Sequence, residues 1–96
     1  MQIKILESAT LDLLHGYRFY EKQEYGLGNY FLDSLFSDID SLLVFAGIHR
    51  MQFGKYRLLA KRFPFAVYYS IQNEIILVFA VLDCRQDPQN VSKRLT

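Results

Sequence analysis

The residues best suited to bind an anion lie in the second half of the chain. From Lys55 to Thr96 seven Lys or Arg residues stand against three Asp or Glu, a net charge of +4, whereas Met1 to Gly54 carries −3. A basic half of this kind suits nucleic acid or an acidic peptide. Ordinary solvation of a sheet face would produce the same charges, and charge alone does not separate the two interpretations.

Some of these cations have a regular spacing. In the segment "KYRLLAKR" (55–62), polar and apolar residues alternate as they do in a strand with one face exposed. The alternation places Lys55, Arg57 and Lys61 on one face, and Arg62 follows directly. Solvated sheet charge remains an equally good interpretation for Lys61 and Arg62.

Metal, cofactor and disulfide chemistry have little support. The single cysteine, Cys84, rules out a disulfide within the chain and fits a reducing cytosol, and its residue type suits a small buried hydrophobe at the end of a strand. His15 and His49 are far apart in sequence, with no carboxylates at metal-ligand spacing. We therefore expect no metal site, no cofactor and a cytoplasmic protein.

The length and composition predict one globular domain, residues 1–96. An apolar fraction of 51%, with 16% aromatic residues, is ample for a packed core. No apolar run approaches the roughly 18 residues needed to cross a bilayer. The first residues lack the basic and apolar regions of a signal peptide.

Two helices are predicted in the first half, after a short edge strand in "QIKIL" (2–6). The first helix takes Ser8 or Thr10 as its N-cap, with Asp12 suited to its positive end. Gly16 lies within its apolar pattern, at some cost in helix propensity. We expect that the absence of a side chain there lets another element approach closely. The short "YGLGNY" break (25–30) predicts that the two helices form an antiparallel hairpin.

The second helix has the clearer pattern. Its apolar stripe consists of Leu27, Phe31, Leu35, Ile39 and Leu42. Its opposite face is predicted to be solvated and acidic, and carries Asp33, Ser34, Ser37, Asp38, Asp40 and Ser41. Gly47 is the expected C-cap.

The chain after Gly47 predicts an antiparallel three-stranded meander. Pro64 precedes the second strand, Gln72-Asn73 forms the tight turn, and Ile75 to Leu82 is apolar on both faces. The last residues form a short helix or a tail. The fold class is α+β with the order β-α-α-β-β-β, a helical hairpin packed on one face of a small antiparallel sheet. The other apolar face would then form an exposed groove or be covered by a partner.

This layout, together with its C-terminal motifs, resembles the RelE/ParE superfamily of type II toxin–antitoxin toxins, which includes plasmid-stabilisation proteins. The family pattern is an Arg in the first meander strand, a Phe-Pro-aromatic block, an apolar strand, an Arg and Asp-Pro. These features fall on Arg57, on 63–69, on 75–82, on Arg85 and on 87–88. The resemblance covers nearly the whole chain.

The resemblance implies a bacterial growth inhibitor that either cleaves mRNA on the ribosome or poisons DNA gyrase. For cleavage, Arg57 and Arg85 from neighbouring strands would hold the phosphate, because guanidinium forks match phosphate oxygens. Asp83 stands where many members have a His, and is expected to pair with Arg85 rather than to act as an acid.

Because the general acid and base that RNA cleavage needs are incomplete, a ParE-like, gyrase-directed action is favoured. The alternatives are a ribosome-dependent, metal-independent mRNA endonuclease and a non-toxic, partner-binding member of the family. The implied partners are a cognate antitoxin, with gyrase or the ribosome and its mRNA as targets, and no membrane. A homodimer or a toxin–antitoxin hetero-oligomer is the expected assembly. Residues predicted to contact nucleic acid or a partner are Lys55, Lys61, Arg62, Tyr69 and Arg94.

Overall fold

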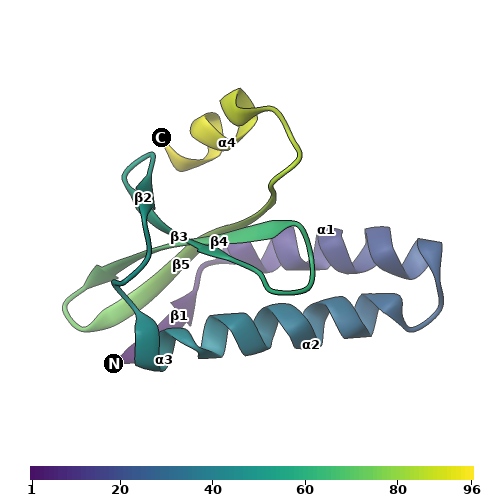
Figure 1. The fold of residues 1–96 in the computed structure, drawn as a ribbon, viewed down its shortest axis with the longest axis horizontal. Helices are drawn as coiled ribbons and strands as arrows, with labels where there is room; N and C mark the ends of the chain where they lie inside the picture. The colour runs from purple at the N-terminus through teal and green to yellow at the C-terminus, as the bar shows by residue number, and fades with distance from the viewer.

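A helical hairpin packs on one side of a five-stranded sheet, and a short C-terminal helix lies on the other side (Figure 1). The structure, a computed structural model, describes residues 1–96. Its elements are β1 (Gln2–Ile5), α1 (Glu7–Gln23), α2 (Leu27–Asp40), α3 (Leu42–Phe45), β2 (Met51–Gln52), β3 (Lys55–Leu59), β4 (Phe65–Gln72), β5 (Ile75–Asp83) and α4 (Pro88–Leu95). None of the helices combines the length and apolar character that a membrane crossing needs.

The sheet has the strand order β1-β5-β4-β3-β2. Strands β3, β4 and β5 form the predicted antiparallel meander, and β1 is the predicted edge strand, parallel to β5. Strand β2 was not predicted from the sequence. It is two residues long and folds back on β3 through Phe53 and Gly54, whose φ angles of 53° and 79° suit a tight hairpin turn.

The predicted packing of the hairpin on the sheet is confirmed, and Gly16 explains how the two helices come so close. A Cβ atom at Gly16 would lie 2.4 Å from Phe31 Cζ, so only glycine leaves room for that ring. Phe31 is fully buried there. The core on this helix face of the sheet contains 14 buried residues, namely Ala9, Leu13, Tyr20, Phe31, Leu35, Ile39, Leu42, Phe63, Phe65, Val67, Tyr69, Ile76, Val78 and Val81.

Helix α4 covers part of the opposite face of the sheet, which explains why β5 is apolar on both sides. Its residues Val91 and Leu95 pack against four buried strand residues, namely Ala66, Tyr68, Ala80 and Leu82. Asp87 caps the helix by accepting a hydrogen bond from the Gln89 N–H at 2.9 Å, and Pro88 follows at the first helical position. The last residues therefore form the helix rather than the tail. The expectation that this face is an exposed groove or is covered by a partner is wrong for the part that α4 covers.

The predicted N-cap of α1 is wrong. The helix begins at Glu7, and neither Ser8 nor Thr10 caps it. The physical reason is that the Leu6 N–H still donates to Val78 O at 3.0 Å, so pairing with β5 continues up to the first helical residue. Ser8 instead donates its hydroxyl to Phe79 O at 2.8 Å.

The second helix also differs from the prediction. Ser34 and Asp38 are buried rather than solvated, because α2 lies against the β3–β4 loop and Asp38 Oδ2 accepts a hydrogen bond from the Lys61 N–H at 3.2 Å. The helix ends at Asp40, and α3 is a separate turn. Gly47, with φ of 96°, follows α3 as the residue that allows the chain to turn away.

The β4–β5 turn lies one residue later than predicted. Gln72 pairs with Ile75, so the two turn residues are Asn73 and Glu74, with φ of 50° and 64°. Positive φ at both central positions is the type I′ geometry that matches the twist of a hairpin. Near the middle of this hairpin the register shifts between Tyr68 and Tyr69.

Candidate functional site

A small pocket on the α4 side of the sheet contains Arg57, the more buried of the two predicted phosphate ligands. The lining residues come from the β2–β3 hairpin, β4, the β5–α4 connection and α4. They are Gln52, Phe53, Arg57, Tyr68, Cys84, Gln86, Pro88 and Val91.

The Arg57 pocket has a volume of about 170 Å³, room for a group the size of a phosphate or a side chain but not for a large ligand. Its chemistry is therefore best read from the lining side chains, of which Arg57 is the only cation.

Arg57 is held by two neighbours in this pocket. Its Nε donates to the Tyr68 hydroxyl at 3.1 Å, and its Nη2 lies 3.5 Å from Cys84 Sγ. Partial burial lowers the pKa of Arg57, but the hydrogen bond to Tyr68 and the other contacts raise it by more, so the pKa lies above its ordinary value. The result is an oriented, permanently charged guanidinium, which suits recognition of an anionic group.

Asp83 and Arg85 form the expected ion pair. Asp83 accepts hydrogen bonds from Arg85 Nε at 3.0 Å and from Nη2 at 2.7 Å. These bonds lower the pKa of Asp83 and raise that of Arg85. Asp83 is therefore an ionised carboxylate at neutral pH and a poor proton donor.

The structure does not bring the two predicted phosphate ligands together. Strand β4 lies between β3 and β5, so Arg57 and Arg85 do not come from neighbouring strands. Arg57 bonds to Tyr68 on the α4 side, whereas Arg85 binds Asp83, which lines a pocket together with α1 residues on the helix side. The prediction of a joint clamp is corrected accordingly: in this structure the two guanidinium groups belong to different surfaces.

Tyr69 is not available to a partner, contrary to the prediction. It is fully buried and stacks on Tyr56 with ring centroids 5.1 Å apart. Its hydroxyl accepts a hydrogen bond from the Gly47 N–H at 2.9 Å and also contacts His49 Nδ1. Successive strand residues point to opposite faces, so Tyr69 enters the core while Tyr68 reaches Arg57.

The predicted lysines have different surroundings. The Lys55 ammonium lies over the Phe79 ring, 4.6 Å from its centroid, a cation–π contact. Strand β3 ends at Leu59, so Lys61 is not on its charged face as predicted. Lys61 and Arg62 are exposed in the β3–β4 loop.

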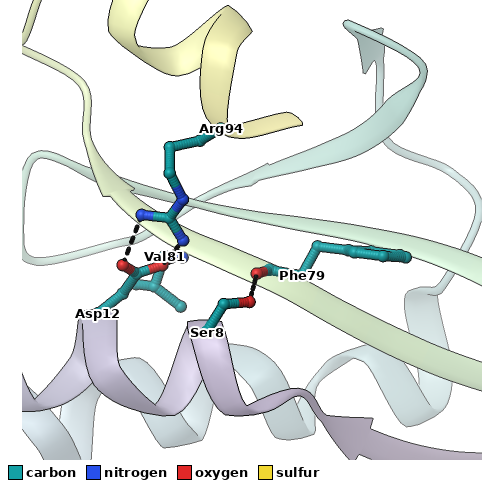
Figure 2. A network of polar contacts seen from close by, with 5 residues as sticks. All are labelled: Ser8, Asp12, Phe79, Val81 and Arg94. Atoms are coloured by element: carbon teal, nitrogen blue, oxygen red, sulfur yellow. Dashed lines mark hydrogen bonds and ion pairs between the residues drawn. The ribbon is translucent and has the colours of Figure 1, made fainter. Parts of the chain in front are cut away.

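Arg94 takes part in a contact that ties α4 to α1. Its two terminal nitrogens donate to the two Asp12 oxygens, each at 2.8 Å, and Asp12 Oδ2 also accepts from the Val81 N–H at 3.0 Å (Figure 2). The hydrogen bond raises the pKa of Arg94. Arg94 is thus engaged within the chain rather than free for nucleic acid. This role of Asp12 was not predicted from the sequence, in which Asp12 was expected only to favour the positive end of the first helix.

Comparison with known proteins supports the fold. No protein-family model matches the chain, and no curated protein matches it. A solved structure described as "Chromosomal ParDE TA system from P. aeruginosa" contains a similar chain, with a TM-score of 0.74 and 21% sequence identity. The match covers 84% of this chain and 92% of that one. The two chains share a fold, as the RelE/ParE resemblance predicted.

Proposed function

We propose that this chain is the toxin of a type II toxin–antitoxin pair and that it inhibits growth by a ParE-like action on DNA gyrase. The observation that carries the proposal is the fold shared with a chain of a ParDE system over most of both lengths. A cognate antitoxin is the proposed partner, and the cytoplasm the proposed location.

The Arg57 pocket favours a binding action over RNA cleavage. Metal-independent cleavage needs a base for the 2′-hydroxyl, an acid for the leaving oxygen and cations for the phosphorane. The pocket offers a cation, a phenol and a thiol. The two carboxylates adjacent in sequence to lining residues are engaged elsewhere: Asp83 pairs with Arg85, and Asp87 accepts a hydrogen bond from the Gln89 N–H as the cap of α4.

Induced expression of the chain alone, in a bacterial host, tests the proposal. We expect growth arrest, relief by the antitoxin, and inhibition of supercoiling when the purified protein is added to gyrase. Arg57→Ala should remove most of the toxicity, whereas Arg18→Ala, which alters an exposed arginine on α1, should not.

Two results would change the assignment. Primer extension that finds mRNA cut at ribosomal A sites, with supercoiling unaffected, would replace gyrase by mRNA as the target. Normal growth in the presence of abundant, folded protein would overturn the toxin proposal and leave a partner-binding protein.

A further inference from the structure

The wall of the Arg57 pocket that the β2–β3 hairpin forms has few supports of its own. Gln52 and Phe53 line the pocket from this hairpin. Strand β2 has only two residues, both exposed, and Phe53 is partly buried against the residues under α4. The Arg57 N–H adds one bond, to the Arg50 carbonyl at 2.8 Å. Because so short a hairpin is only marginally stable by itself, it needs an anchor outside its own strands.

The connection from α3 to β2 contains such an anchor, on the helix face of the sheet. The Gly47 N–H donates to the Tyr69 hydroxyl at 2.9 Å, and His49 Nδ1 contacts the same hydroxyl. Tyr69 is fully buried, so its ring is a fixed point. In Figure 1 this connection runs from α3, at the end of the helical hairpin, to β2, which lies on the side of α4. His49 directly precedes Arg50, whose carbonyl begins the pairing with β3.

The contacts of the Tyr69 hydroxyl determine the protonation state of His49. The phenol oxygen accepts from the Gly47 N–H, so its own proton needs an acceptor, and His49 Nδ1 is the only acceptor that it contacts. The imidazole is therefore neutral, with its proton on Nε2. A protonated imidazole has two donors and no acceptor, and would leave a buried O–H without a partner.

The groups that surround His49 are phenols and a cation. The Tyr69 ring, from β4, lies edge-on to the imidazole with centroids 5.5 Å apart, and Tyr56, from β3, stacks on Tyr69. Arg50 is the charged neighbour on the same connection, and neither His49 nor Arg50 forms an ion pair. Partial burial lowers the pKa of His49. These surroundings favour the neutral imidazole that the hydroxyl requires.

We propose that His49 and Tyr69 are positioning residues for the Arg57 pocket: the neutral imidazole holds the connection to β2 in place, and protonation of His49 releases the pocket wall that carries Gln52 and Phe53. The Arg57 side chain itself stays bonded to Tyr68. The inference concerns how the pocket is built and does not rest on the toxin proposal, so growth assays and the experiment below can fail separately.

Hydrogen exchange followed by NMR tests the proposal on the full chain. The observable is the protection factor of the Arg57 amide, which reports its bond to the Arg50 carbonyl. It is measured across the titration of His49, which the imidazole resonances follow. We expect it to fall at least about fivefold as His49 becomes charged, because a buried donor loses its partner. The amides of β5 should keep their protection, since the sheet itself stays folded.

Two variants and a control separate the positioning role from a general effect of acid. His49→Gln supplies a carbonyl that accepts from the Tyr69 hydroxyl without titrating, so protection should stay high at every pH. Tyr69→Phe keeps the ring but removes the hydroxyl, so protection should be low at every pH. His15→Gln replaces the other histidine, exposed on α1, and should leave the pH dependence unchanged.

Three results would overturn the proposal. One is a protection factor of the Arg57 amide that stays constant as His49 titrates. Another is a pH dependence that persists in His49→Gln, and the third is full protection in folded Tyr69→Phe. If Tyr69→Phe does not fold, the comparison of His49→Gln with the unaltered protein decides alone.

Discussion

The two faces of the sheet differ in how they are covered. The helix face has 14 buried residues and a cluster of aromatic rings, with Phe31 5.0–5.2 Å from the rings of Tyr20, Phe63 and Phe65. The α4 face has six buried residues and depends on polar contacts at its margins. The comparison indicates that the helix face provides most of the stability, whereas the α4 face contains the Arg57 pocket.

The largest effect is expected from Phe31→Ala. Removing a fully buried ring from the helix face should cost about 3–5 kcal/mol of unfolding free energy. Urea denaturation followed by circular dichroism measures it. Phe36→Ala, an exposed position on the same helix, is the control and should change stability little. Similar losses in both variants would contradict the account of the core.

A smaller effect is expected where α4 is tied to α1. Asp12→Ala leaves the Val81 N–H and Arg94 without their partner, and should cost about 1–3 kcal/mol. Arg94→Ala should cost less, because Asp12 keeps its bond to Val81, and should mainly increase hydrogen exchange in α4. Asp12→Asn, which keeps an acceptor for Val81, should resemble Arg94→Ala. The reverse order would show that the ion pair, rather than the backbone bond, dominates.

The pH dependence of stability should report on His49. Burial lowers the pKa of His49 below its ordinary 6.5, so the unfolded chain binds more protons than the folded one as the pH falls through that value. Stability contributed by the neutral imidazole is present above pH 6.5 and is lost as the pH falls. Denaturation midpoints measured across this range should show a shallower slope in His49→Gln. An unchanged slope would exclude His49 as the source.

The smallest effect is expected from Asp83→Asn. The Asp83–Arg85 pair is solvent-exposed, with 59% of the Arg85 side chain accessible, and exposed pairs contribute little. Thermal unfolding at neutral pH should be nearly unchanged. A large fall in the midpoint would mean that this pair supports the fold more than its exposure indicates.

Local patterns were enough to predict most of the fold. The stripe from Leu27 to Leu42, the close approach at Gly16 and the apolar run from Ile75 to Leu82 depend on residue type and spacing, and each was confirmed in outline. Helix starts and turn positions were less predictable. Ser8 is a residue type that commonly caps helices. It does not cap α1, because the pairing with β5 continues to Leu6 and the helix begins before Ser8.

The candidate site was harder to predict, because it depends on which face each side chain occupies. Tyr68 and Tyr69 are adjacent and alike, yet one bonds to Arg57 and the other is buried in the helix-face core. A shift of one residue exchanges the two faces of a strand, and the register shift beside these tyrosines is set by pairing with β5.

By itself, the sequence determined the α+β class, the helical hairpin and the meander, since these follow from local periodicity. Only the tertiary structure decided that Arg57 and Arg85 lie on different surfaces and that Arg94 binds Asp12. Those outcomes depend on contacts between residues far apart in the chain, such as Asp12 and Arg94 with a sequence separation of 82, and no local pattern encodes such contacts.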